Sequence, residues 1–276
     1  MSMRLRHALR NSIVEAIMLL LSLIILLPIL VMVFGSFKSS AEVLDFSLKL
    51  PKEWLFSNYK QVYEQGNLLR SFMNGIVITG ISSIINIVTT SAASFVLVRR
   101  ESRMSNFLYL FFFMGLIAPM STITTIRVVQ WLGFYGSVAS VILVYAALNT
   151  AFSVFLYNGF IKSIPKALDE VAFLEGAGMF TVFFRIIIPL IVPVNATVLI
   201  MVFMSVWNDI TIPIYFLTDS TDWTMPLAVY NFYGLYSRDW NLIFAVLVLT
   251  SLPVFILYLF AQKYIIGGLT AGSVKG

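Results

Sequence analysis

The chain has 276 residues, of which 59% are hydrophobic and only 11% are charged, and its mean hydropathy is +0.92. A soluble globular domain is about half apolar and about one quarter charged, so this composition indicates an integral membrane protein. The formal net charge of +5 includes no basic cluster that would favour a nucleic-acid partner. The chain contains no cysteine, which excludes disulfides, thiol catalysis and thiolate metal sites.

Six apolar segments predict an all-α polytopic membrane protein with six transmembrane helices. A helix needs roughly 20 apolar residues to cross the hydrocarbon core. In chain order the segments are Ala16–Phe34, Phe72–Val98, Phe107–Ile126, Val138–Ile161, Ile186–Leu217 and Asn241–Tyr264. These continuous runs do not alternate as the strands of a membrane barrel would. The first run is too long for the core of a signal peptide, so we expect a retained span.

The Lys and Arg residues of the loops predict how the chain is oriented. With the N-terminus in the cytoplasm, 11 of the 18 Lys and Arg residues lie inside and 7 lie outside. Four of these outside residues belong to one longer loop, residues 38–60, and long loops count less in this comparison. We therefore expect both termini in the cytoplasm, together with the loop between the fourth and fifth spans.

That loop is unusually polar for a chain of this composition. Pro165 suits the first turn of a helix, where its missing N–H costs nothing, and Asp169 and Glu170 follow near the positive end of the same helix. Gly176 and Gly178 permit a sharp turn before a second amphipathic piece. The sequence predicts a short helix, a bend and a second short helix across the membrane face. An ordinary amphipathic connector is the alternative interpretation.

One stretch of this loop carries a family resemblance. From Glu170 to Ala177 the chain reads Glu-Val-Ala-Phe-Leu-Glu-Gly-Ala, and Phe183, Pro189 and Pro193 follow. This resembles the "EAA" loop of ABC-importer permeases, whose usual pattern is Glu-Ala-Ala-x-x-Asp-Gly-Ala, later Phe, then Pro-Leu-x-x-Pro. Val171 for Ala and Glu175 for Asp are conservative departures from that pattern.

The resemblance covers essentially the whole chain and narrows to carbohydrate importers of the maltose type. Other segments similar to those permeases are Asn58-Tyr59, Phe72-Met73-Asn74-Gly75, Trp207-Asn208-Asp209 and Thr224-Met225-Pro226-Leu227. The C-terminal stretch Gly268–Gly276 is similar to the tail of the G-type subunit of such importers.

The resemblance implies a type I ABC importer permease with the MetI-like fold. Residues 1–71 would hold the N-terminal tail, the first span and an external loop. Residues 72–266 would form the permease core, which includes a cytoplasmic coupling loop at 164–189, and residues 267–276 would form a cytoplasmic tail. The implied location is the inner membrane of a bacterial cell, in contact with membrane lipid.

The resemblance also implies the partners and the division of labour. A second homologous permease subunit would complete the pore, two ATPase subunits would bind ATP and Mg and hydrolyse the nucleotide, and an extracellular sugar-binding protein would deliver the sugar. This chain itself would be a non-catalytic transport subunit, without a catalytic residue, metal site or cofactor. No nucleic acid is expected among its partners.

The residues implied to dock an ATPase subunit lie in the coupling loop: Glu170, Val171, Ala172, Glu175, Gly176 and Ala177. The tail Thr270–Gly276 would lie near the ATPase dimer. Asn208 and Asp209 are polar residues in or near the fifth span, and they either face the translocation path or brace the helix. Aromatic residues in the external loop Thr218–Trp240 suit contact with the binding protein, or equally an interfacial belt.

The second span carries a hydroxyl-rich surface of small residues: Ser82, Ser83, Asn86, Thr89, Thr90, Ser91, Ala92 and Ala93. Small residues let membrane helices approach closely and polar ones bond across the interface, so helix packing is favoured over lining the sugar path.

Two other function classes are open to a chain of this composition. A secondary transporter would have coupling-ion sites near the midplane and often inverted repeats, and neither is evident in the sequence. An intramembrane enzyme needs a base or metal ligands in the membrane, but the only histidine is His7, in the N-terminal tail.

Overall fold

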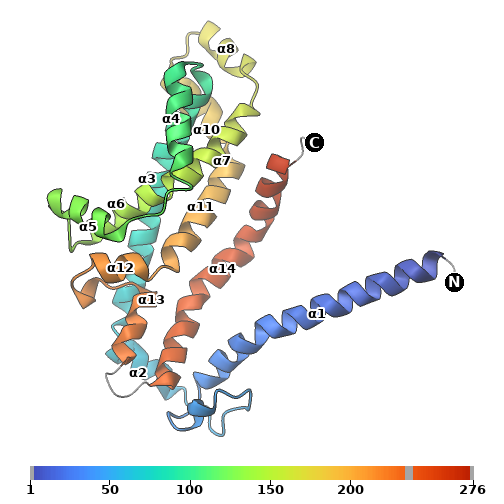
Figure 1. Cartoon of the computed structure of the whole chain (residues 1–276), viewed down its shortest axis with the longest axis vertical. Coiled ribbons are helices and arrows are strands. Elements are labelled where there is room, and N and C mark those ends of the chain that lie inside the picture. The colour runs from blue at the N-terminus through green and yellow to red at the C-terminus, as the bar shows by residue number, and fades with distance from the viewer. Residues whose placement is uncertain (1–2, 234–238, 274–276) are drawn as a thin grey trace. The chain divides into compact units, whose positions relative to one another are not determined.

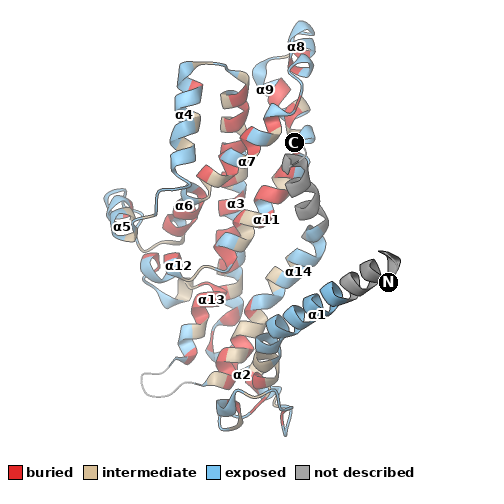
Figure 2. Cartoon of the chain, turned by 45° about the vertical axis from the view of Figure 1, so that its right-hand side comes forward, coloured by how far each residue is buried: buried red, intermediate tan, exposed pale blue. Residues whose placement is uncertain are grey.

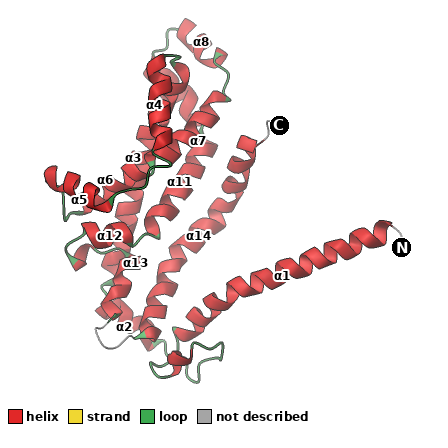
Figure 3. Cartoon of the chain, in the orientation of Figure 1, coloured by secondary structure: helices red, strands yellow, loops and turns green. Residues whose placement is uncertain are grey.

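The computed structural model describes residues 3–233 and 239–273, which form helices joined by turns and loops (Figure 3). These residues divide into two compact units, one from Met1–Leu68 and Ala228–Leu252 and the other from Leu69–Leu227 and Pro253–Gly276. The division places residues 228–252 with the N-terminal region. Each unit is described by itself.

The first unit contains the long N-terminal helix α1 (Met3–Gly35), as Figure 1 labels it. All side chains of residues 13–30 are exposed, although this helix is strongly apolar (Figure 2). The same unit holds η1 (Glu42–Asp45), α2 (Ser57–Gln65), η4 (Val229–Phe232) and the first part of α14 (Trp240–Ser273). An apolar surface left uncovered within its own unit suits a helix surrounded by lipid or by other protein.

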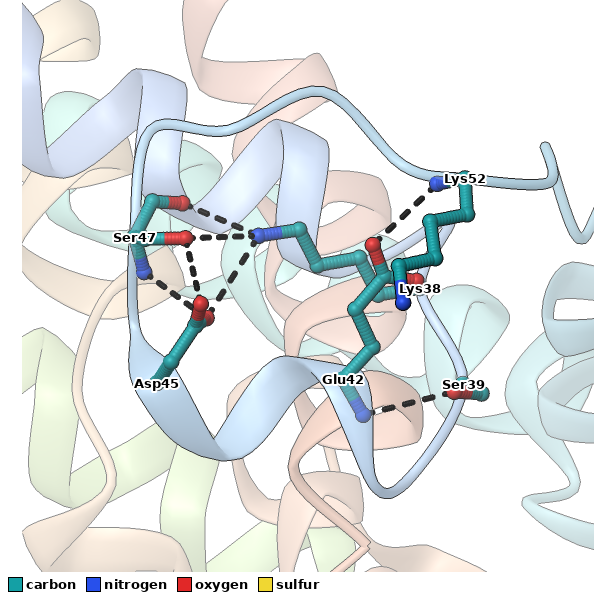
Figure 4. A network of polar contacts seen from close by, with 6 residues as sticks. All are labelled: Lys38, Ser39, Glu42, Asp45, Ser47 and Lys52. Atoms are coloured by element: carbon teal, nitrogen blue, oxygen red, sulfur yellow. Dashed lines mark hydrogen bonds and ion pairs between the residues drawn. The ribbon is translucent and has the colours of Figure 1, made fainter.

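A polar network stabilises the segment that follows α1 (Figure 4). The side chain of Lys38 is only 1% exposed, and its Nζ donates to the carbonyl oxygen of Ser47 at 3.0 Å and lies 3.7 Å from the carboxylate of Asp45. Hydrogen bonds from Ser47 hold the pKa of Asp45 below its usual value. The buried side-chain amide of Asn58 donates to the carbonyl oxygens of Ser36 and Lys38, at 2.9 Å each. The buried ammonium is therefore compensated by its own loop.

The second unit is a helical bundle built around α7 (Thr150–Lys162), which packs against α4 (Arg103–Met114) and α11 (Val192–Trp207). It also contains α3 (Leu68–Arg99), α5 (Thr122–Trp131), α6 (Val138–Leu148), α12 (Thr211–Phe216), η3 (Ser220–Asp222) and α13 (Met225–Ala228), apart from the end residues Leu68 and Ala228. Its apolar core draws on α3, α6, α7 and α11 together.

The hydroxyl-rich surface of α3 is used for helix packing. Ser82 donates to the carbonyl oxygen of Ile142 at 3.3 Å, and the side-chain amide of Asn86 donates to that of Ala146 at 3.1 Å. One further bond, from Ser94 to the carbonyl oxygen of Val154 at 3.4 Å, keeps the same separation of 60 residues along the chain. These bonds connect α3 to α6 and α7, as the sequence predicted.

A bend of 42° separates α6 from α7 and has a visible cause. The carbonyl oxygen of Ala146 accepts from the Thr150 hydroxyl at 2.7 Å and from Asn86 of α3. Ser153 donates to the side-chain oxygen of Asn86 at 2.6 Å. Side chains that insert into the backbone ladder bend a helix while they satisfy the groups released by the bend.

The described residues include three single helices long and apolar enough to cross a membrane: Ile13–Gly35 of α1, α3, and Trp240–Phe260 of α14. Two bent pairs pass the same test together, α6 with α7 and Met179–Leu190 with α11. The expected span Phe107–Ile126 is not one continuous helix, because α4 ends at Met114 and α5 begins at Thr122. Gly115 and Pro119 lie in this break, and α4, with 12 residues, is only about 18 Å long.

Candidate functional site

The predicted coupling loop folds as a helix, a bend and a second helical stretch at one end of the second unit (Figure 1). The helix α8 (Ala167–Leu174) is followed by α9 (Met179–Val182), the π-helical segment η2 (Phe183–Ile187) and α10 (Ile188–Leu190). The chain then bends by 75° into α11. This arrangement matches the order of elements expected from Pro165, the glycines and Pro189.

The bend after α8 depends on Gly176, which has a φ of +84°. Its N–H donates to the carbonyl oxygen of Phe173 at 3.0 Å, and the N–H of Ala177 donates to that of Ala172 at 2.9 Å. This pair of bonds is a Schellman motif, which ends a helix with a left-handed residue and satisfies its last carbonyl groups. Glycine adopts this conformation without steric cost, so Gly176 sets the direction in which the chain leaves α8.

An ion pair connects the start of α8 to the end of α3. The Arg99 Nε lies 2.5 Å from Oδ2 of Asp169, and both side chains are less than 10% exposed. The same guanidinium donates from Nη1 to the carbonyl oxygen of Ile164 at 3.1 Å. A buried arginine that contacts both a carboxylate and a helix-flanking carbonyl fixes the position of α8 relative to α3.

A second ion pair supports the same junction at the surface. Lys166 contacts the carboxylate of Glu101, and this hydrogen bond, followed by the charge of Lys166, lowers the pKa of Glu101. Both groups are at least half exposed, so this pair contributes little to overall stability. Its effect is to bring the linker before α8 close to the linker after α3.

The residues predicted to dock a partner lie on α8 and directly after it, and most of them are exposed. Figure 2 shows that α8 is largely exposed. Glu170, Val171, Glu175 and Gly176 are exposed, and Ala177 is partly buried. Ala172 is 7% exposed and belongs to the apolar core of this chain. The exposed face therefore presents the two carboxylates outward, while Ala172 holds α8 on the bundle.

Exposed apolar side chains lie close in sequence to the two carboxylates. Leu174 is 89% exposed and Phe180 is 82% exposed, and Val171 is exposed by more than half. A short helix that carries carboxylates beside large uncovered apolar side chains has the composition of a protein interface with a polar rim.

Asn208 and Asp209 lie at the end of α11, beside a hollow of about 450 Å³ that also contacts Tyr145 and Asn149. The carboxylate of Asp209 is occupied by its own chain: it accepts from the hydroxyl of Tyr145 at 2.9 Å and from the N–H groups of Thr211 and Ile212 at 2.9 and 3.0 Å. Asp209 thus braces the start of α12. The Asn208 side chain is exposed, and its amide donates to the carbonyl oxygen of Met204 at 2.9 Å.

The external loop expected at Thr218–Trp240 is only partly described, and Tyr236 lies outside the described residues. Within the second unit, Trp223 packs against the apolar core, and its carbonyl oxygen accepts from the side-chain amide of Asn74 at 3.2 Å. Of the predicted C-terminal tail at 267–276, residues 267–273 belong to α14, and residues 274–276 lie outside the described residues.

Sequence reasoning missed the connection between α3 and α8. In the sequence, Arg99 is one of the Lys and Arg residues that predict orientation, and Asp169 is an acid near a helix start. In the structure these residues, 70 positions apart, form one buried ion pair. The signal available was a pair of arginines, Arg99 and Arg100, at the end of one span and an acid, Asp169, at the start of α8. The sequence alone does not say that the two ends meet.

Comparison with known proteins gives the family. Residues 85–270 match the family described as "Binding-protein-dependent transport system inner membrane component". The chain belongs to this family of ABC-importer permeases. Among its curated relatives, the permease is 34% identical to the melibiose/raffinose/stachyose import permease MelC of Bacillus subtilis, over 91% of each chain. It is 31% identical to AmyC of Thermoanaerobacterium thermosulfurigenes, a probable permease for starch degradation products, over 93% of this chain and 94% of that protein.

Solved structures confirm the fold of the permease. A subunit of a bacterial ABC transporter involved in the import of the acidic polysaccharide alginate superposes with a TM-score of 0.83 at 20% identity, over 94% of this chain and 98% of that one. A chain of the methionine transporter MetNI superposes with a TM-score of 0.54 over 73% of this chain and 95% of that one. The predicted all-α importer-permease fold is therefore confirmed, as is the prediction of a non-catalytic membrane transport subunit.

Proposed function

We propose that the permease forms the transmembrane pathway of an ATP-driven importer that takes up an oligosaccharide or related sugar. The observation that supports this substrate class is the shared description of several relatives, including MelC, AmyC and the multiple-sugar permease MsmG of Streptococcus mutans, which is 33% identical over 92% of this chain. An extracellular sugar-binding protein would deliver the substrate. Asn208, exposed beside its hollow, is the better candidate for the path, because Asp209 is engaged by backbone and tyrosine donors.

The exposed face of α8 would dock one ATPase subunit. Glu170 and Glu175 supply charge, while Val171 and Leu174 supply apolar area that is otherwise left in water. Gly176 and Ala177 would shape the exit from the helix, and Ala172 would act from beneath by holding α8 on the bundle. ATP and Mg would be bound by the ATPase subunits, so that this chain receives motion rather than nucleotide.

A second permease subunit and membrane lipid complete the proposed surroundings of this chain. A second homologous permease would close the pathway, and the uncovered apolar length of α1 leaves room for lipid or subunit contact.

The ends of α3 and α7 meet at the coupling loop, because Arg99 reaches the carbonyl of Ile164. The loop would therefore share the cytoplasmic side with both helix ends, in a bacterial inner membrane with the N- and C-termini inside.

A charge reversal at Glu170 tests the docking role. The Glu170→Lys variant should insert normally but should fail to co-purify with the ATPase subunits, and sugar-stimulated ATPase activity should fall by about tenfold or more. Glu64→Lys is a matched control, because Glu64 is exposed on α2, in the loop expected outside. Wild-type assembly and activity of Glu170→Lys would rule out docking by this face.

The transport function has its own test in whole cells. Uptake of a labelled oligosaccharide should stop when the partner ATPase is inactivated and should continue when the proton gradient is collapsed. The opposite pattern would indicate a secondary transporter.

The orientation of the chain in the membrane can be measured by labelling introduced cysteines, because the chain has no cysteine of its own that would react. A membrane-impermeant thiol reagent should label Glu53→Cys in intact cells and should label Glu175→Cys only after the membrane is opened. Labelling of Glu175→Cys in intact cells would overturn the proposed topology.

A further inference from the structure

Beside the coupling loop, a polar cavity of about 530 Å³ lies between the end of α3, the start of α4 and the end of α7. It lies wholly within the second unit. Its lining includes three cationic side chains, Arg99, Lys162 and Lys166, and one carboxylate, that of Glu101. The docking face of α8 does not use this cavity, and the proposed transport path gives it no role.

The charges of the cavity are only partly balanced. Arg99 is paired with Asp169, and Lys166 is paired with Glu101. Among the ion pairs of the described residues none involves Lys162, whose ammonium instead lies 5.3 Å from the ring centroid of Tyr109. The cavity thus keeps one uncompensated positive charge, next to an aromatic wall.

A buried polar side chain also borders the cavity without a partner. Asn158 of α7 is 3% exposed, and its Oδ1 is buried without a hydrogen bond. A buried amide oxygen without a hydrogen-bond partner is costly, so a molecule that supplied a partner here would be bound favourably. Because the two ends of an asparagine amide can exchange by rotation, Asn158 can offer either a donor or an acceptor to that molecule.

The start of α4 adds a positive end of a helix to the same cavity. α4 has 12 residues, and Ser105 and Asn106, in its first turn, line the cavity. The Ser102 side chain caps only the N–H of Ser105, at 3.1 Å. A helix start beside a free ammonium group is a favourable environment for an anion.

We propose that this cavity binds the phosphate of an anionic phospholipid headgroup, with Lys162 as the charge partner and Asn158 as the hydrogen-bonding partner. Tyr109 and the start of α4 form its wall. The shared chemistry is a phosphate group, and a membrane lipid is the source that the surroundings favour. The outer side of α4 exposes apolar side chains next to the cavity, with Met104 65%, Phe107 62% and Phe111 61% exposed, where acyl chains can lie.

This site would adjoin the junction of α3 and α8. Arg99 and Lys166 line the cavity and also anchor the coupling loop. A bound phosphate would add a negative charge beside both anchors and would stiffen the connection. The binding itself depends neither on the sugar nor on the ATPase, so its test is separate from the test of transport.

The test uses the purified full-length permease, stripped of lipid and examined by native mass spectrometry. Phosphatidylglycerol should bind about tenfold more tightly than phosphatidylcholine, as one charge-assisted contact would give. Lys162→Gln should remove most of that preference. Asn158→Leu should weaken the binding of phosphatidylglycerol, although the charge of Lys162 remains. Arg185→Gln is the matched control, since Arg185 is an exposed cation within the coupling loop that does not line the cavity.

Each outcome decides the proposal. Equal binding of the two lipids, or an unchanged preference in Lys162→Gln, would overturn it. Competition by millimolar inorganic phosphate that displaces phosphatidylglycerol and is lost in Lys162→Gln would support the phosphate site. Binding of inorganic phosphate without binding of either lipid would show a phosphate site whose natural ligand is free phosphate and not a membrane lipid.

Discussion

The interface where α3 packs against α6 and α7, called the seam below, buries its polar side chains. The outer face of α8 leaves its side chains exposed. In the seam, polar groups such as Asn86 and Ser153 are buried and bonded to one another. On α8, the carboxylate of Glu170 and the apolar side chain of Leu174 both remain exposed. The seam is built from residues of this chain alone, whereas the face of α8 leaves apolar side chains uncovered and is the surface that we propose binds a partner.

The difference predicts where substitutions act. Changes in the seam and at the α8 anchor should alter the stability of the isolated permease. Changes on the outer face of α8 should leave that stability almost unchanged and should alter assembly instead. Four experiments, in order of expected effect, test this division.

The largest effect is expected at the buried anchor of α8. Asp169→Ala leaves the Arg99 guanidinium buried without its carboxylate, which should cost about 3–5 kcal/mol of unfolding free energy. Thermal unfolding of the purified permease measures the loss. The double variant Arg99→Met with Asp169→Ala should recover part of it, because no unpaired charge remains. Equal losses in the single and double variants would show that the charge pair is not the cause.

A smaller effect is expected in the seam. Asn86→Leu removes the bonds to Ala146 and Ser153 and should cost about 1–2 kcal/mol. Asn208→Leu is the matched control, because Asn208 is exposed and donates only to a carbonyl of its own helix. Unfolding midpoints of the two variants should therefore differ clearly. Similar midpoints would contradict the assignment of Asn86 to packing.

A local effect is expected at the bend after α8. Gly176→Ala should destabilise the helix end by about 1 kcal/mol, because alanine disfavours a φ of +84° even where open space surrounds its side chain. Gly178→Ala meets equally open space without the positive φ and should change little. Hydrogen exchange of residues 167–178 distinguishes them. If both variants exchange at the same rate, the conformation of Gly176 is not limiting.

The smallest effect concerns acid pH at the surface pair. Because the hydrogen bond from Lys166 lowers the pKa of Glu101, the pair contributes fully above the usual value of 4.5 and is lost as pH falls through the lower folded value. Exchange rates around α8, corrected for intrinsic chemistry, should therefore not change between pH 8 and 6. Below about pH 4.5 wild type and Glu101→Gln should converge. A difference that persists in acid would exclude the carboxylate as its origin.

The sequence predicted the coupling loop well because its determinants are local. Pro165 marks a helix start, and Gly176 marks a helix end that no other residue adopts as easily. The buried position of Ala172, by contrast, depends on which side of α8 meets the bundle. That orientation is set by Arg99 from another helix, so the local pattern did not contain it.

The third expected span shows the opposite case. The hydropathy averaged over Phe107–Ile126 predicts one membrane-length apolar helix. In the structure the helix is interrupted between Met114 and Thr122. Gly115 and Pro119 are the local signals for that break, and the average hides them. Pro28 and Pro253 lie inside continuous helices, so a proline alone does not distinguish a kink from an end.

The constant spacing of 60 residues between donors on α3 and acceptors on α6 and α7 limits how this chain can change length. Inserting one residue into α3 between Ser82 and Ser94 would rotate every later side chain of α3 by about 100° about the helix axis. Ser94 would then no longer face its acceptor, the carbonyl oxygen of Val154. An insertion between Gly133 and Ser137 would leave all three bonds in phase. Natural and engineered length variation should therefore accumulate in that turn and avoid the seam.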